Sequence, residues 1–93
     1  MNDGTYRKTN FGYVPVMLNE GYWVSPTQGD VDPDTLEVGD YLGVWTDENG
    51  TVHYDRSYFV LDKGTALILC RQWKQKAIWD IANHVAIPIN PDY

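Results

Sequence analysis

Three carboxylates next to aromatic residues are the side chains whose types suit chemistry best. Asp47, Asp55 and Asp80 each follow an aromatic or near-aromatic stretch, and two histidines, His53 and His84, lie nearby in the sequence. Carboxylates and imidazoles are common metal ligands and acid–base groups. Their spacing matches no fixed helical interval, and an aspartate at the end of a strand often serves a turn or a cap. A small metal-dependent enzyme that uses these residues is therefore an alternative, and we predict no metal or cofactor.

The single cysteine is a weak candidate for a nucleophile. Cys70 would need His53 or His84 as its base, but it falls on the apolar face of a predicted helix, where free cysteines are usually buried. The sequence has no phosphate-binding glycine loop, no CxxC pair and no G-x-S-x-G motif. We assign no catalytic residue, and a non-enzymatic role is favoured.

The acidic segment from Asp30 to Asp34 resembles the beginning of a calcium-binding loop. Such a loop needs a glycine at its sharp turn and a distal bidentate glutamate. Thr35 and Tyr41 occupy those two positions, so both requirements fail. The sequence therefore indicates a solvated acidic loop.

An acidic loop beside aromatic residues is typical of a protein-binding surface. Residues 30–48 contain seven acids and no lysine or arginine. Exposed tryptophan and tyrosine side chains are frequent anchors of protein interfaces. We predict a contact region for a partner with a basic surface, formed by Trp23, Asp30, Asp32, Asp34, Glu37, Asp40 and Tyr41.

The charge of the 93-residue chain is −6 and is unevenly distributed. Residues 1–50 have nine acids and two bases, whereas residues 51–93 have four acids and five bases. Negative charge repels nucleic acids and anionic lipids, which argues against direct DNA or RNA binding. The same charge suggests, as an alternative, an acidic nucleic-acid mimic that inhibits a host DNA-binding enzyme.

The apolar content of 43% is that of an ordinary globular protein. With one cysteine no internal disulfide can form, and no apolar run approaches the length of a membrane span or a leader. These features predict a soluble, cytoplasmic protein with no membrane contact. They leave its oligomeric state open.

The elements that would position these residues form a small α+β fold. We expect a flexible segment over 1–10 and one globular domain over 11–90. The Asn-Gly pair at 49–50 is a strong hairpin signal. The predicted sheet is mixed, mostly antiparallel, and has four to six strands; its segments are an N-terminal hairpin over 11–18 and 22–25, a hairpin over 41–46 and 51–54, and strands over 57–60, 77–81 and 85–89.

One helix, over about 62–75, should cover the sheet. Asp62 is a good N-cap. Ala66, Leu69, Cys70 and Trp73 share one apolar face at helical spacing. The strand–helix–strand segment over 57–81 could form a parallel crossover, and an open sheet face with aromatic residues would be a candidate binding surface.

The stretch Leu42-Gly43-Val44-Trp45-Thr46-Asp47, followed by Tyr54-Asp55, a helix and Ala77-Ile78-Trp79-Asp80-Ile81-Ala82-Asn83, resembles a pattern in small uncharacterised proteins of actinobacteria and their phages. The resemblance covers roughly residues 41–83. This helix ends in basic residues, whereas those proteins look more acidic there. The resemblance implies a phage or mobile-element context and no mechanism. The favoured interpretation is a non-enzymatic protein-interaction module that acts as an accessory protein of a phage or mobile element.

Overall fold

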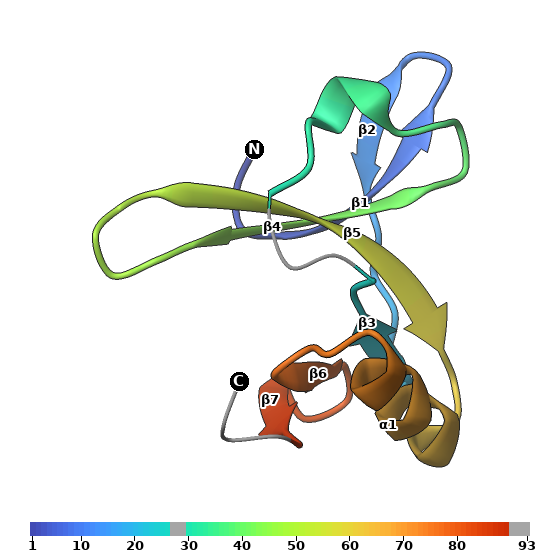
Figure 1. Ribbon diagram of the computed structural model, residues 1–93. Helices are drawn as coiled ribbons and strands as arrows, with labels where there is room; N and C mark the ends of the chain where they lie inside the picture. The colour runs from blue at the N-terminus through green and yellow to red at the C-terminus, as the bar shows by residue number, and fades with distance from the viewer. Residues whose placement is uncertain (27–29, 90–93) are drawn as a thin grey trace. The chain divides into compact units, whose positions relative to one another are not determined.

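The computed structural model describes residues 1–26 and 30–89 (Figure 1). The elements in chain order are β1 (Gly4–Thr9), β2 (Gly12–Pro15), β3 (Tyr22–Val24), the short 3-10 helix η1 (Pro33–Thr35), β4 (Tyr41–Thr46), β5 (Val52–Val60), α1 (Lys63–Gln72), β6 (Ala77–Asp80) and β7 (Val85–Pro88). No helix in the described part of the chain is long and apolar enough to cross a membrane.

The strands pair in the order β2-β1-β4-β5-β3-β6-β7. The predicted α+β class, with one helix, is confirmed. The sequence predicted four to six strands, whereas the sheet has seven. It is also not mixed, because every pair of neighbouring strands is antiparallel.

The chain groups into two compact units. Unit 1 contains Met1–Met17 and Gly29–Ser57, and unit 2 contains Leu18–Gln28 and Tyr58–Tyr93. Strand β5 belongs to both, since its Val52–Ser57 part pairs with β4 and its last three residues pair with β3. Each unit has its own cluster of buried side chains.

Unit 1 is a four-stranded arrangement, β2-β1-β4-β5, with η1 and its flanking residues over one face (Figure 1). Leu42 and Val44 are the buried residues of β4, and Leu36, which follows η1, packs against them. The alternation of β4 explains this: residues two apart point to the same face, so Leu42 and Val44 face the core while Gly43 and Trp45 face the other way.

Residues 4–9, within the segment over 1–10 that the sequence predicted to be flexible, form an inner strand. Strand β1 pairs with β2 on one side and with β4 on the other. Its polar sequence, GTYRKT, gives little sign of this. Tyr6 packs against the core cluster, and the Lys8 ammonium donates to the backbone carbonyls of Asp34 and Leu36.

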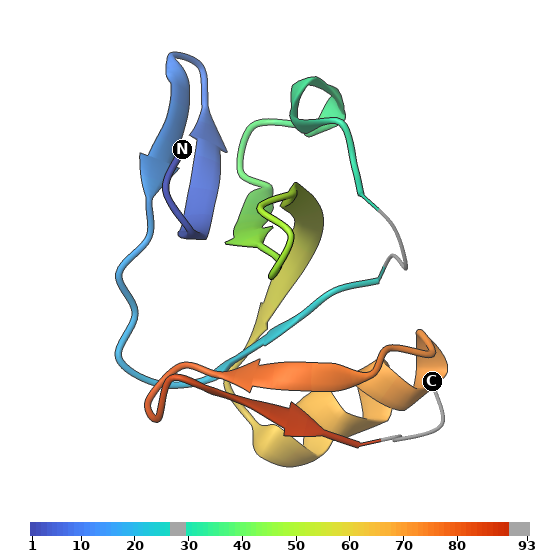
Figure 2. The same ribbon diagram turned by 90° about the vertical axis from the view of Figure 1, so that its left-hand side faces the viewer.

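Unit 2 packs α1 against one face of the strands β3, β6 and β7 (Figures 1 and 2). Its buried centre combines two strand residues, Val24 and Ile78, with two helix residues, Ala66 and Cys70. The predicted apolar face of the helix is thus confirmed, since Leu69 and Trp73 pack against the same cluster. Burial raises the pKa of the Cys70 thiol, as expected for a packing residue.

The predicted N-terminal hairpin over 11–25 does not form. Strand β2 pairs with β1, whereas β3 lies between β5 and β6 and is antiparallel to both. Strands β5 and β6 therefore run in the same direction with β3 inserted between them. The predicted crossover over 57–81 joins two parallel strands, but they are not neighbours in the sheet.

Helix α1 starts as predicted and ends earlier. The Asp62 carboxylate accepts a hydrogen bond from the Thr65 N–H at 2.8 Å, the geometry of an N-cap. The helix ends at Gln72, because Lys74 adopts a left-handed conformation with φ 54°. The N–H groups of Lys74 and Gln75 then bond back to the carbonyls of Arg71 and Cys70, which is the Schellman pattern.

Candidate functional site

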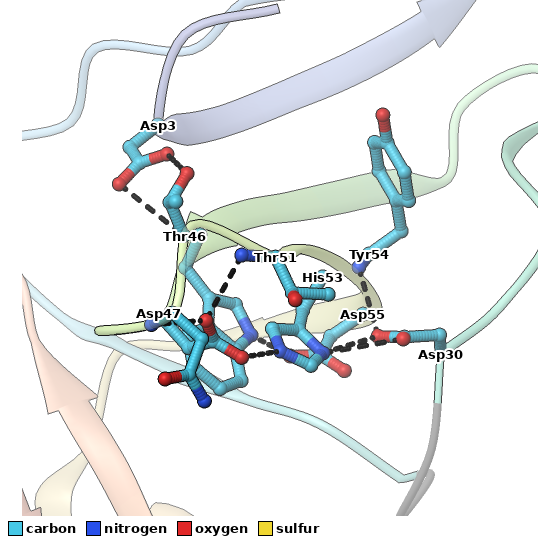
Figure 3. A network of polar contacts seen from close by, with 10 residues as sticks. Asp3, Asp30, Thr46, Asp47, Thr51, His53, Tyr54 and Asp55 are labelled. Carbon is cyan, nitrogen blue, oxygen red and sulfur yellow. Dashed lines mark hydrogen bonds and ion pairs between the residues drawn. The ribbon is translucent and has the colours of Figure 1, made fainter.

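A polar network on unit 1 is centred on His53 (Figure 3). Its Nδ1 lies 3.1 and 3.2 Å from the two carboxylate oxygens of Asp30, and its Nε2 lies 2.8 Å from Oδ2 of Asp47. The imidazole therefore sits between two carboxylates that come from different parts of the chain. Asp30 precedes η1, and Asp47 begins the turn between β4 and β5.

The β4–β5 turn holds Asp47 in place. Its Oδ1 accepts hydrogen bonds from the backbone N–H groups of Asn49 and Thr51, both at 2.9 Å. Its own N–H donates to the Thr51 carbonyl, and its carbonyl accepts from Gly50. The hairpin predicted from Asn-Gly is thus confirmed, and its first residue uses one carboxylate oxygen for the turn and the other for His53.

Asp30 completes the free edge of β5 within unit 1. Its Oδ1 accepts from the Tyr54 N–H at 3.1 Å, and the N–H of the next residue, Val31, donates to the Tyr54 carbonyl at 2.8 Å. The Asp30–Val31 pair therefore satisfies both backbone groups of Tyr54 that point away from β4. A buried or half-buried strand edge needs such partners.

Trp45 and Asp55 lie on the same face of the sheet as His53. Trp45 is the cross-strand partner of His53, and the two rings stack with centroids 4.2 Å apart and planes 19° apart. The indole N–H of Trp45 donates to the Asp55 carboxylate at 2.7 Å. Burial raises the pKa of Asp55, an effect that the hydrogen bond from Trp45 partly offsets.

The two carboxylates stabilise the charged form of His53. The hydrogen bond to Asp47 is the main cause that raises the pKa of His53 above its usual 6.5, and the Asp30 carboxylate adds to it. The same contact, with the N–H of Thr51, lowers the pKa of Asp47. Because both ring nitrogens are occupied by carboxylates, His53 in this geometry offers no free nitrogen to accept a substrate proton.

The carboxylates named as an alternative catalytic set fall in both units. Asp47 and Asp55 come together around His53 in unit 1. Asp80 and His84 belong to unit 2, where the Asp80 carboxylate accepts hydrogen bonds from the N–H and the side-chain amide of Asn83. Over residues 1–26 and 30–89, no three His, Cys, Asp or Glu side chains are placed to hold a metal ion.

Most of the acidic segment predicted to bind a partner is tied to unit 1 by its own contacts. Asp32 caps η1 by accepting from the Asp34 N–H at 2.9 Å. The Asp40 carboxylate accepts from the Glu37 N–H and lies 3.4 Å from the guanidinium of Arg56. Together with the contacts of Asp30 to His53, these bonds give three of the five predicted acids a structural role.

The remaining predicted contact residues do not all belong to the same unit. The side chains of Asp34 and Glu37 are exposed on unit 1, and Tyr41 is half-buried in β4. Trp23 lies in β3 of unit 2 and thus belongs to the other unit. The predicted contact region is therefore not brought together within one unit.

Trp23 instead belongs to a row of aromatic residues on a sheet face, whose other members were not predicted from the sequence. In unit 2, Trp23 pairs across the strands with Phe59 of β5 and with Trp79 of β6. Directly opposed residues point to the same side of a sheet, and their neighbours in sequence, such as Val60 and Ile78, pack against α1. The row therefore lies on the face of unit 2 away from the helix.

The aromatic row, defined as Phe59, Trp23 and Trp79, is partly open to solvent. Phe59 is 38% exposed and Trp79 is 42% exposed. The rings of Trp23 and Phe59 meet edge to face, with centroids 5.7 Å apart. In β5 and β6, Phe59 and Trp79 alternate with residues that face the helix, and this alternation could have indicated an aromatic face. Only the strand order shows that three strands contribute to one row.

Comparisons with protein-family models, with curated proteins and with solved structures found no match to this chain.

Proposed function

We propose that the protein is a non-enzymatic protein-interaction module and that the aromatic row is its main contact surface. The observation that carries the proposal is the placement of Phe59, Trp23 and Trp79 side by side on the helix-free face of unit 2. Neighbouring aromatic side chains that remain partly exposed are the residues on which interface energies concentrate.

The position of the row on strands favours binding. Strand residues have few alternative positions, so a partner would order few side chains when it binds, and the entropic cost would be low. The core of unit 2 lies on the other face, under α1. A partner could therefore cover the row without displacing any buried side chain of that core.

The charge of unit 1 favours a partner with a basic surface. Unit 1 has nine acids against three lysines and arginines, whereas the described part of unit 2 has three acids against four bases. The side chains of Asp34, Glu37 and Glu48 are exposed. Such a field accelerates the approach of a positively charged partner and weakens as salt is added.

An accessory protein of a phage or mobile element is the biological context that we infer. Its support is the sequence resemblance over residues 41–83. A small interaction module without catalytic residues suits that role. Affinity capture from the native host, followed by identification of the captured protein, would test the context directly.

The interaction proposal is tested by comparing exposed residues of similar type. We expect Trp79→Thr and Phe59→Thr to lose capture of the host partner, because each removes an aromatic ring and introduces threonine, a β-branched residue that suits a strand. Val52→Thr is the matched control, since Val52 is a 40% exposed strand residue of unit 1 outside the row. Circular dichroism would establish that all three variants fold. Equal capture by all three would overturn the row as the contact surface.

A nucleic-acid mimic is the second candidate, and the negative charge of unit 1 favours it. A mimic would compete with DNA for a basic protein through its carboxylates. In that case a triple variant, Asp34→Asn, Glu37→Gln and Glu48→Gln, would lose capture while Trp79→Thr would keep it. The opposite pattern would support the aromatic row, so one experiment separates the two candidates.

A further inference from the structure

We propose that His53 is a pH-dependent clasp, which in its protonated state joins the chain at Asp30 to the β4–β5 turn at Asp47 and which opens when the imidazole loses its proton. The proposal is independent of the aromatic row. It concerns only unit 1.

The geometry requires two donors on one ring. Both ring nitrogens of His53 lie within hydrogen-bond distance of a carboxylate, at 3.1 Å from Asp30 and at 2.8 Å from Asp47. A neutral imidazole has one N–H and one lone pair, so it can donate to only one of them. The other carboxylate would then face a lone pair at the same distance. Only the imidazolium satisfies both contacts at once.

Each carboxylate also accepts hydrogen bonds from backbone N–H groups. The proton on His53 therefore links the segment at Asp30 to the β4–β5 turn. Asp47 is fixed by the N–H groups of Asn49 and Thr51 in its own turn. Asp30 is held by the Tyr54 N–H and by no residue of its own segment among the contacts found for the described chain. Loss of the proton should therefore release Asp30 first, and the Tyr54 N–H would lose its acceptor.

The groups around the ring favour the cation. Three carboxylates face it: Asp30 from the segment before η1, Asp47 from the turn, and Asp55 from β5 itself. From β4, Trp45 stacks on the ring. An aromatic face attracts a neighbouring positive charge.

The pH window follows from the directions of the shifts. The pKa of His53 is raised, so the clasp contributes its full stability below the usual 6.5 and loses it as pH rises through the raised value. The pKa of Asp47 is lowered from 3.8, so its contribution is present above 3.8 and is lost as pH falls through the lowered value. The clasp is closed at pH values between the lowered pKa of Asp47 and the raised pKa of His53, and it opens when the pH rises above the His53 pKa.

The test is an NMR titration of the full chain with amide exchange. We expect His53 to titrate above 6.5 in the unaltered protein, and to titrate at lower pH in Asp30→Asn and in Asp47→Asn. Exchange protection of the Tyr54 amide, corrected for the intrinsic effect of pH, should fall as pH passes the His53 pKa. In His53→Gln that protection should not change over the same range.

Two controls keep the test decisive. The amides of Leu42 and Val44, in the core strand β4, should stay protected and so report that unit 1 is folded in every variant. The amide of Ile78, in the core of unit 2, should exchange alike in all the proteins. The proposal fails if His53 titrates at or below 6.5, if Asp30→Asn leaves its titration unchanged, or if Tyr54 protection ignores the His53 proton.

Discussion

Two aspartates of one hairpin differ in what the structure does to their charge. Asp47 is an acceptor for His53 and for two backbone N–H groups, which lowers its pKa. Asp55 is half-buried and accepts a hydrogen bond from the indole of Trp45, and its burial raises its pKa. The first residue is stabilised as an anion, and the second is penalised as one.

The variant Asp55→Asn should gain stability relative to the unaltered protein as pH rises from about 3 to about 7. The raised pKa means that the contribution of Asp55 is full below 3.8 and is lost as pH rises through the folded-state value. An asparagine stays neutral and keeps an oxygen for the Trp45 N–H, so it avoids this loss. Urea unfolding at both pH values measures the change.

Asp47→Asn is the matched variant of opposite sign. Because the pKa of Asp47 is lowered, its charge stabilises the fold above 3.8, and the variant should lose relative stability over the same pH interval. The same direction of change in both variants would show that the two carboxylates share one environment, contrary to the structure.

At the scale of elements, the C-terminal end of α1 has a lysine at a position where glycine is most common. The Schellman pattern requires a left-handed residue, most often glycine, and here that residue is Lys74. The left-handed conformation destabilises the folded state by about 1–2 kcal/mol when the residue is not glycine. Glycine removes this strain, but it also raises the conformational entropy of the unfolded chain, which offsets part of the gain in stability. Lys74→Gly should therefore raise the free energy of unfolding by about 0.5–1 kcal/mol.

The control for this prediction is Lys74→Ala, which removes the same side chain but keeps the backbone strain. We expect thermal unfolding to place the glycine variant above the alanine variant. If the two variants unfold at the same temperature, the conformation of residue 74 does not limit the stability of the helix end.

Gly21 supports the aromatic row from below. A Cβ at this position would lie 2.4 Å from Cε2 of Phe59, at a backbone φ of +99°. Gly39, at φ +97°, has open space around the same position. Both alanine variants should lower the free energy of unfolding by about 1–2 kcal/mol, because alanine is strained at a positive φ. Only Gly21→Ala should also displace Phe59. The partly exposed ring can turn aside, so we expect an added cost of about 1 kcal/mol.

Urea unfolding of Gly21→Ala and Gly39→Ala measures that difference, and the NMR signal of the Trp23 indole reports the displacement, since its ring meets Phe59 edge to face. An unchanged indole signal in Gly21→Ala would mean that the ring of Phe59 does not rest on residue 21.

The elements that the sequence predicted well are those with local signals. The β4–β5 hairpin follows from Asn-Gly, and the start of α1 follows from the Asp62 cap. The pairing of β3 with β5 and β6 has no local signal, because its partners lie more than thirty residues further along the chain. Strand β1 is polar because half-exposed strands tolerate polar residues, and its sequence therefore resembled a frayed end.

The candidate site was predicted in its residue types but not in its grouping. His53, Asp47 and Asp55 were named from chemistry, and the hairpin brings them together. Asp30 was assigned to a partner surface because nothing in a solvated loop reveals a contact with a histidine 23 residues away. Trp23 was placed with the acids for the same reason: sequence proximity does not report which unit a residue joins.

At the scale of the whole molecule, the division into units is also a division of charge. Unit 1 has a net charge of −6, whereas unit 2 holds seven charged residues of both signs within its described part. Like charges within one compact unit repel, and added salt screens them over a distance of about 10 Å at 0.1 M.

Raising the salt concentration from about 0.01 to about 0.2 M should therefore slow amide exchange in unit 1 more than in unit 2. The amides of the β1–β4 ladder report on unit 1, and those of the β3–β6 pair provide an internal control. Equal slowing in both units would indicate a general salt effect and not relief of repulsion within unit 1.

The strand order also has a consequence for the time at which each part can form during synthesis. Strand β3 leaves the ribosome before its partners, because in the described part of the chain it pairs with residues 58–60 of β5 and with β6. Between its appearance and theirs, the ribosome must add more than thirty further residues, and Trp23 has no strand to pair with. Chains that stop before β5 would carry an unpaired hydrophobic strand, so interrupted translation should yield products that depend on chaperones or aggregate.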